Sequence, residues 1–167
     1  KDLVNFLKTL DSRKKISIIG AGSNTLITDD IYDGIVIKLG KNFNRLSLLN
    51  ENIIISGAAV LDKKLADFAA ENDLSGFEFL ACIPGTIGGG LKMNAGCFGR
   101  EIKDILISIQ AVDKIGNILT IQAKEINFNY KPILVGGLHN LLRITAPAFI
   151  KSKLRHMMSD CDLIAAK

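Results

Sequence analysis

The most informative stretch of the chain reads Ile83-Pro84-Gly85-Thr86-Ile87-Gly88-Gly89-Gly90, and Asn94-Ala95-Gly96 follow it closely. Six glycines lie between residues 85 and 99, but the apolar side chains among them are too numerous for a flexible linker. We expect an ordered, packed segment. Pro84 fits just before or at the first turn of a short helix, so the amides around Gly85, Thr86 and Ile87 are expected to form an exposed, positively polarised end that binds pyrophosphate. Close helix packing through small residues is the alternative explanation.

An earlier glycine segment reads Gly20-Ala21-Gly22-Ser23-Asn24-Thr25 and follows the apolar run Ile16-Ser17-Ile18-Ile19, which predicts a buried strand. Glycine lets a phosphate approach bare amides, and Ser23 and Asn24 add side-chain donors. The Rossmann fingerprint fails here, because its sixth position is Thr25 and residues 26–30 do not read as a helix. A tight turn after a strand is the alternative. Together, the two segments suit a long anionic cofactor.

Composition narrows the class of protein. The chain has 167 residues, 48% of them hydrophobic, and a net charge of +4 with a pI of about 9.0. This modest excess suits an anionic nucleotide cofactor and substrate but does not demand nucleic acid. With no apolar run long enough for a membrane span and no signal-peptide pattern, we expect a cytoplasmic protein.

Cysteine and histidine give no metal or disulfide pattern. Cys82, Cys97 and Cys161 form no C-x-x-C pair, and we expect them to be small buried or inert thiols. His139 and His156 are isolated, so no metal is expected. A basic cluster near the end of the chain is interpreted as the solvated face of a terminal helix; its residues are Lys151, Lys153, Arg155 and His156.

Apolar spacing predicts an α/β fold, of the α+β kind, in two lobes. The first lobe, about residues 1–73, has a helix at 2–10, strands at 16–19, 35–39 and 53–55, the last ending at Gly57, and a helix at 61–71. The second, about residues 74–167, is richer in strands. It contains a hairpin of residues 105–112 and 118–121 around a turn at 113–117, and a last strand at 141–149 in which Pro147 is best placed at an edge or near an end.

The glycine segments, together with Met93-Asn94-Ala95-Gly96-Cys97-Phe98-Gly99-Arg100-Glu101, resemble the UDP-N-acetylenolpyruvoylglucosamine reductases, the flavoenzymes often called MurB. The resemblance covers most of the chain. It implies a two-lobed FAD-binding domain of the vanillyl-alcohol-oxidase type, with NADPH as reductant and a UDP-sugar as substrate, acting in peptidoglycan synthesis. The cofactor-binding positions it implies are Gly20, Ala21, Gly22, Ser23, Asn24, Thr25, Gly57, Pro84, Gly85, Thr86, Gly88, Gly89, Asn94, Ala95 and Gly96.

The catalytic residues of that family match less well. The family uses an arginine after Phe-x-Tyr, a serine in Gly-Ser-x-Phe and a glutamate near the C-terminus, whereas Phe128-Asn129-Tyr130 is followed here by Lys131 and no Gly-Ser-x-Phe follows. Lys131 is the one catalytic candidate, and it keeps the charge of an arginine without its bidentate fork. We expect the FAD-binding portion of a larger enzyme, without the substrate-binding domain and inactive alone. A non-catalytic flavin or nucleotide module and another FAD-dependent oxidoreductase, acting on a sugar or hydroxy acid, are the alternatives. The sequence leaves the oligomeric state open.

Overall fold

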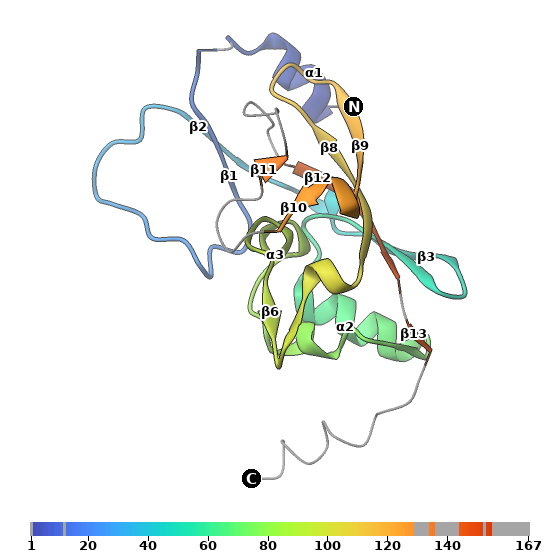
Figure 1. Ribbon diagram of the computed structural model, residues 1–167. Coiled ribbons are helices and arrows are strands. Elements are labelled where there is room, and N and C mark those ends of the chain that lie inside the picture. Colours follow the sequence, from blue (N-terminus) through green and yellow to red (C-terminus); the bar gives the residue numbers. More distant parts are fainter. Residues whose placement is uncertain (1, 12, 129–133, 136–143, 152, 155–167) are drawn as a thin grey trace.

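The structure, a computed structural model, describes residues 2–11, 13–128, 134–135, 144–151 and 153–154 (Figure 1). The helices are α1 (Asp2–Thr9), α2 (Asp62–Glu71) and α3 (Ile87–Met93), with 3-10 turns η1 (Lys41–Phe43), η2 (Glu78–Cys82), η3 (Ile102–Asp104) and η4 (Ala123–Glu125). The strands are β1 (Ile16–Ile19), β2 (Ile35–Lys38), β3 (Leu46–Asn50), β4 (Ile53–Ser56), β5 (Leu74–Ser75), β6 (Gly96–Cys97), β7 (Arg100–Glu101), β8 (Leu106–Val112), β9 (Ile118–Gln122), β10 (Ile126–Asn127), β11 (Leu134–Val135), β12 (Ile144–Lys151) and β13 (Lys153–Leu154).

The two main sheets differ in the relative direction of their strands. β1 and β2 form a parallel pair, and a five-stranded antiparallel sheet has the order β3-β4-β12-β8-β9. The predicted hairpin is the β8–β9 pair, closed by a turn in which the Asp113 carboxylate accepts hydrogen bonds from the Ile115 and Asn117 amides. The α+β class predicted from the sequence is confirmed. This sheet contains strands from before and after residue 73, so it crosses the predicted boundary between the two lobes. The division into lobes stays a prediction.

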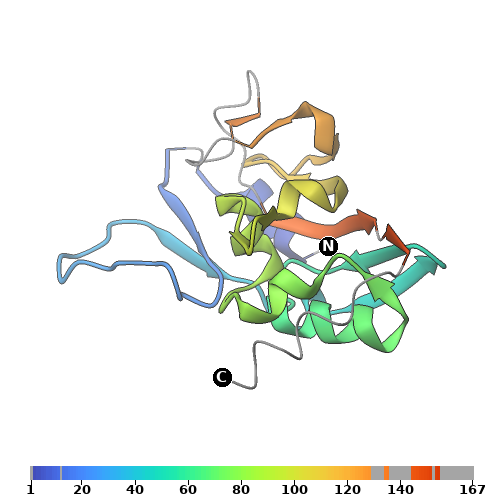
Figure 2. The same ribbon diagram turned by 60° about the horizontal axis from the view of Figure 1, so that its bottom comes forward.

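The main core lies between the five-stranded sheet and the helices α2 and α3 (Figures 1 and 2). α2 is amphipathic and buries Leu65, Ala66 and Ala69, while α3 contributes Ile87 and Leu91. These side chains belong to one apolar cluster with buried residues of β4 and β8. The core therefore fixes the N-terminal ends of both helices relative to the sheet.

A smaller apolar cluster holds the parallel pair. Leu7 of α1 and Val112 of β8 are buried at its centre, and partly buried side chains of β1 and β2 pack on them. The prediction of a buried first strand is wrong, because Ser17 is exposed and the other residues of β1 are only half-buried. The expected absence of a crossover helix is confirmed: residues 20–34 form an extended excursion, clear in Figure 1, on which Leu26 and Ile31 are exposed.

β12 corrects the placement of Pro147. The strand lies in the middle of the sheet rather than at an edge. Its register with β8 shifts between Ala146 and Ala148, and its pairing with β4 begins only at Ala148. Pro147 therefore occupies a bulge where no ladder hydrogen bond from its nitrogen is required. The predicted terminal helix is also wrong at Lys151 and Lys153, which lie in β12 and β13; Arg155 and His156 are outside the described residues.

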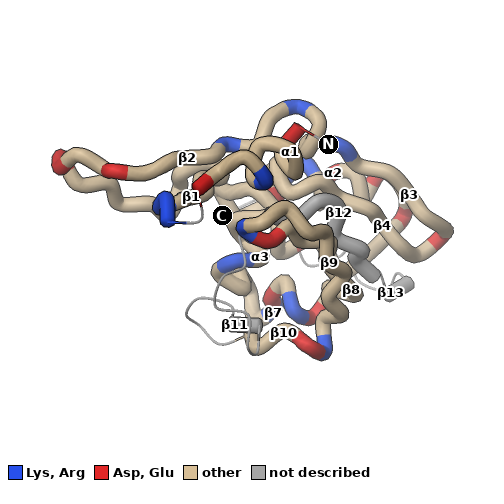
Figure 3. The backbone as a smooth tube through the Cα atoms, turned by 90° about the horizontal axis from the view of Figure 1, so that it is seen from above, with Lys and Arg blue, Asp and Glu red and all other residues tan. Residues whose placement is uncertain are grey.

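Basic and acidic residues are interspersed along the described chain (Figure 3). Among the described residues, no helix has both the length and the apolar character needed to span a bilayer.

Candidate functional site

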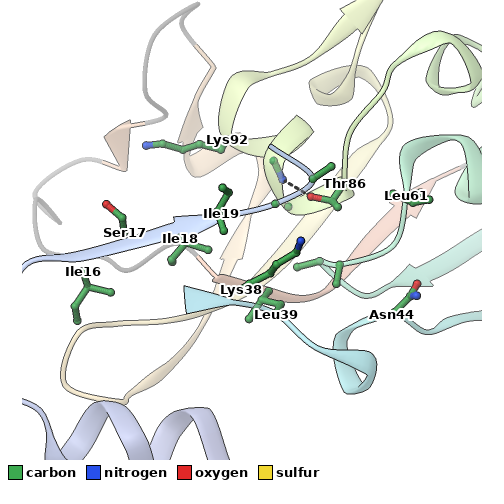
Figure 4. Close-up of a pocket in the computed structure, with 16 residues that line it drawn as sticks. Ile16, Ser17, Ile18, Ile19, Lys38, Leu39, Asn44, Leu61, Thr86 and Lys92 are labelled. Carbon is green, nitrogen blue, oxygen red and sulfur yellow. Dashed lines mark hydrogen bonds between the residues drawn. The ribbon is translucent and has the colours of Figure 1, made fainter. Parts of the chain in front are cut away.

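The two glycine segments meet at a cavity of about 710 Å³ (Figure 4). One wall comes from β1, the residues after it and the end of β2, and the other from the chain before α2 and the start of α3. The lining residues are Ile16, Ser17, Ile18, Ile19, Gly20, Ala21, Lys38, Leu39, Asn44, Ala58, Ala59, Leu61, Thr86, Gly88, Gly89 and Lys92. Five of the predicted cofactor-binding residues are among them, namely Gly20, Ala21, Thr86, Gly88 and Gly89.

The two segments touch through Gly20 and Thr86. A Cβ added to Gly20 would lie 2.5 Å from Thr86 Oγ1, so only glycine allows this approach. Ser23 Oγ lies on the same side, 3.9 Å from where a Cβ of Gly85 would be. The first segment is also a tight turn, because the Thr25 amide donates to the Gly22 carbonyl at 3.2 Å and Gly22 has φ +84°. Residues 22–25 thus form a tight turn, while Gly20 and Ala21 line the cavity, and a cofactor-binding role for the turn stays a prediction.

Pro84 lies just before α3, as the sequence predicts. The helix begins at Ile87, and Thr86 is its N-cap. The Ile87 amide donates to the Val60 carbonyl at 2.8 Å, the Gly88 amide to the Ala58 carbonyl at 2.9 Å, and the Gly89 amide to Thr86 Oγ1 at 3.4 Å. Of the amides that were expected to form an exposed, polarised end, that of Ile87 is therefore already bonded, and the anion-binding role of this turn stays a prediction. The turn also offers a ligand bare glycine backbone.

The other predicted positions do not line the cavity; they are Gly22, Ser23, Asn24, Thr25, Gly57, Pro84, Gly85, Asn94, Ala95 and Gly96. Several have packing reasons for their identity. A Cβ at Gly57 would overlap the Phe43 carbonyl, and one at Gly96 would overlap the Arg100 carbonyl. Asn94 ends α3 with φ +47°, donates to Glu101 Oε2 at 2.9 Å and accepts from the Lys103 amide at 3.1 Å.

The sequence analysis did not identify two lysines, or most of the apolar residues, that line the cavity. Lys38 and Lys92 both line the cavity, and Figure 4 shows the Lys38 ammonium group pointing toward Thr86. Within the described part of the chain, Lys38 forms no ion pair. Its position was visible in the sequence, because it ends the strand that follows the first glycine segment. The neighbouring apolar wall includes Ile18, Leu39 and Leu61.

Asp62 is an unexpected feature behind the second glycine turn. It is the first residue of α2, it is 0% exposed, and neither carboxylate oxygen has a hydrogen-bond partner among the described residues. Burial raises the pKa of this carboxyl to about 7, because the apolar surroundings disfavour its charged form. A neutral Asp62 is therefore compatible with the fold near neutral pH.

Two further predictions can be checked at single residues. Of the cysteines expected to be buried or inert thiols, Cys82 is exposed and Cys97 is half-buried. Of the apolar residues in the second glycine segment, Ile87 and Leu91 are buried, whereas Met93 and Phe98 are exposed. Lys131, Cys161, His139 and His156 lie outside the described residues. Among the residues that are described, no His, Cys, Asp and Glu side chains gather as a metal-binding group.

Comparisons with known proteins agree with the motifs. The family model described as "FAD binding domain" matches residues 1–122. UDP-N-acetylenolpyruvoylglucosamine reductase of Pelagibacter ubique (strain HTCC1062) is 62% identical over 130 residues, covering 78% of this chain and 43% of that protein. The same-named protein of Orientia tsutsugamushi (strain Ikeda) is 46% identical over 139 residues, covering 81% of this chain and 46% of that protein. The chain thus spans less than half the length of these relatives.

Solved structures give the same answer for the fold. The crystal structure of UDP-N-acetylenolpyruvylglucosamine reductase (MurB) from Thermus caldophilus matches with a TM-score of 0.67 at 27% identity, over 91% of this chain and 53% of that chain. An alkyldihydroxyacetonephosphate synthase matches with a TM-score of 0.57 at 20% identity, over 83% of this chain and 27% of that chain, which shows a shared fold alone. The predicted resemblance and fold class are confirmed.

The contact between Gly20 and Thr86 predicts the effect of a methyl group. Gly20→Ala should lower the free energy of unfolding by about 1 to 3 kcal/mol, because the new Cβ overlaps Thr86 Oγ1 and the two segments must separate. Thermal or urea unfolding measures the change. Gly40→Ala is the control, since a Cβ there meets nothing within 4 Å, and it should change stability by no more than about 0.5 kcal/mol. Equal effects of the two variants would contradict the contact.

The buried Asp62 predicts a pH dependence of stability. Its pKa is about 7 in the folded chain against 3.8 for the ordinary group, so folding binds a proton between these values. The contribution of Asp62 to stability should therefore be greatest below about pH 4, fall as pH rises, and level off above about pH 7, by at most about 4 kcal/mol. Urea unfolding at a series of pH values measures it. Asp62→Asn should flatten this part of the curve; an unchanged slope would show that Asp62 ionises normally.

Proposed function

The chain belongs to the FAD-binding domain family, and we propose that it holds FAD in the cavity between its two glycine segments as part of a UDP-N-acetylenolpyruvoylglucosamine reductase. The observation that carries this placement is the meeting of Gly20 and Ala21 with Thr86, Gly88 and Gly89 at one cavity. The reductase assignment rests on the names of relatives at up to 62% identity.

The cavity fits a dinucleotide in size and chemistry. Its volume of about 710 Å³ is within the range of about 300 to 1,000 Å³ that is typical of cofactor sites. Gly20, Gly88 and Gly89 present backbone without a Cβ, which lets a bulky anion come close. Thr86 keeps a hydroxyl group at the point where the segments meet. These features support placing the diphosphate of FAD between the segments.

Lys38 and the apolar residues of the cavity are proposed to contact different parts of FAD. We infer that Lys38 faces the diphosphate, because its ammonium group points toward Thr86 and has no acidic partner among the described residues. Ile18, Leu39 and Leu61 offer apolar surface for the ring systems. Apolar walls also exclude water, which strengthens each polar contact within the site.

Bound FAD supplies the hydride chemistry, taking reducing equivalents from NADPH to the enolpyruvyl group of UDP-N-acetylglucosamine enolpyruvate to give UDP-N-acetylmuramate. We propose that Lys131 offers positive charge near the reacting group, in place of the arginine of the family. This function would place the chain in the cytoplasm, in peptidoglycan precursor synthesis, and hence in cell-wall biogenesis, cell shape and division.

FAD binding is the direct test of the proposed site. The purified chain titrated with FAD should bind one equivalent, seen as a change in flavin fluorescence. Lys38→Gln should weaken binding by about tenfold or more, because a charge-assisted contact to the diphosphate is lost. Lys41→Gln removes an exposed lysine that does not line the cavity and should leave the affinity unchanged. No saturable binding by the folded wild-type chain would refute the proposed function.

The catalytic limits of the chain are tested with NADPH and the enolpyruvyl nucleotide. The printed sequence has no Gly-Ser-x-Phe after Lys131, so general acid assistance worth about 10²- to 10⁴-fold is missing. We expect turnover well below about 1 s⁻¹, a modest rate for an enzyme. NADPH oxidation at steady state is followed by absorbance, with the Pelagibacter ubique relative as the positive control. Product formation at that rate or faster would show that another residue donates the proton.

A further inference from the structure

A buried carboxyl group stands directly behind the turn that lines the cavity. The Asp62 side chain is fully buried and neither oxygen has a hydrogen-bond partner among the described residues. Unpaired polar groups in a protein interior are costly and rare, so each needs an explanation. An apolar side chain at this position would avoid that cost. The FAD contacts proposed above do not use Asp62, which does not line the cavity.

The shape of the second glycine turn is fitted to this carboxyl group. A Cβ at Gly85 would lie 2.5 Å from Asp62 Oδ2. A Cβ at Gly90 would lie 2.8 Å from Ile102 Cδ1 and 3.3 Å from Asp62 Oδ1. Gly85 does not have a positive φ, so its backbone conformation alone would accept alanine. What requires glycine at position 85 is therefore the nearby carboxyl group, not the geometry of the chain.

The same turn is joined to Asp62 through the backbone. The Asp62 amide donates to the Gly85 carbonyl at 3.2 Å, and Leu61 pairs with Thr86 as an isolated antiparallel bridge. Thr86, Gly88 and Gly89, in the same segment, line the cavity. Any movement of Gly85 or Gly90 away from Asp62 would therefore move the residues that face the ligand.

We propose that Asp62 is a positioning residue of the cofactor site, whose carboxyl group fills the space behind Gly85 and Gly90 and so sets the shape of the turn that faces the cavity. The glycines of one motif then divide into two sets. Gly88 and Gly89 leave room for the cofactor, whereas Gly85 leaves room for Asp62 and Gly90 for Ile102 and Asp62. The effect on FAD rests on the proposed function of this cavity, but the fit between Asp62 and Gly85 does not.

A double-mutant cycle between positions 62 and 85 tests the fit. In the full chain, Gly85→Ala should weaken FAD binding by about tenfold, because its methyl group displaces the carboxyl or the turn. Asp62→Ala removes both oxygens and should also weaken binding by about tenfold, since the turn loses its support. In the Asp62→Ala background, Gly85→Ala should cost less than about threefold, because the methyl group enters the vacated space. Flavin fluorescence titration gives each dissociation constant.

Two further variants separate positioning from a general loss of structure. Gly89→Ala is the matched control, because its Cβ would lie 3.3 Å from Thr86 Oγ1 and no Asp62 atom is nearby; its cost should be the same in both backgrounds. Asp62→Asn keeps the shape of the side chain and should bind FAD within about threefold of the wild type. Equal costs of Gly85→Ala in the two backgrounds, or an Asp62→Asn defect as large as that of Asp62→Ala, would overturn the proposal.

Failure of the proposed function can be distinguished from failure of the fit between Asp62 and the turn. If the folded wild-type chain binds no FAD, the same cycle is measured from the urea unfolding of the four proteins. Coupling between positions 62 and 85 would then uphold the fit of Asp62 to the turn while the cofactor assignment falls. Additive effects in unfolding would overturn the fit itself.

Discussion

The site depends on the pairing of residues 58–62 with residues 85–88. The Ile87 and Gly88 amides donate to the Val60 and Ala58 carbonyls, and the Asp62 amide donates to the Gly85 carbonyl. Because these bonds join the start of α2 to the start of α3, they place the second glycine turn beside the cavity without relying on a ligand. They also use the amides of Ile87 and Gly88 at the N-terminus of α3. Under the function proposed above, bare glycine backbone and Lys38 are left to recognise the diphosphate.

Glycine in this chain is chiefly a means of close contact between segments. At Gly20 the neighbour is the Thr86 hydroxyl, at Gly57 it is the Phe43 carbonyl, and at Gly85 it is the Asp62 carboxyl. In each case a Cβ would have to occupy space that another group already fills. Three glycines that look alike in the sequence therefore serve three different contacts, and only Gly20 among them lines the cavity.

Local pattern predicted several of the elements, whereas the predictions failed where contacts between distant segments decide the structure. The spacing of apolar residues predicted α1, α2, β4 and the β8–β9 hairpin, since each depends on neighbours within a few positions. The occupied amides of α3 depend on residues 58–60, which no local pattern connects to Ile87. Pro147 led us to predict an edge position or a strand end. The bulge that accommodates it in a central strand can be recognised only when the partner strands are known. Asp62 gave no signal, because an acidic residue is ordinary in the first turn of a helix.

Because the cavity lies between two parts of the fold, a bound ligand would help to hold them together. One wall belongs to the parallel pair, whose two four-residue strands rest on a small apolar cluster, and the other belongs to the main core. A two-stranded sheet is marginally stable by itself, so its contact with the rest of the chain contributes much of its order. A ligand that touches both walls binds only when they are together and therefore stabilises that arrangement by mass action. Gly20 and Thr86 bring the walls into contact at one point, and the ligand would extend that contact along the cavity.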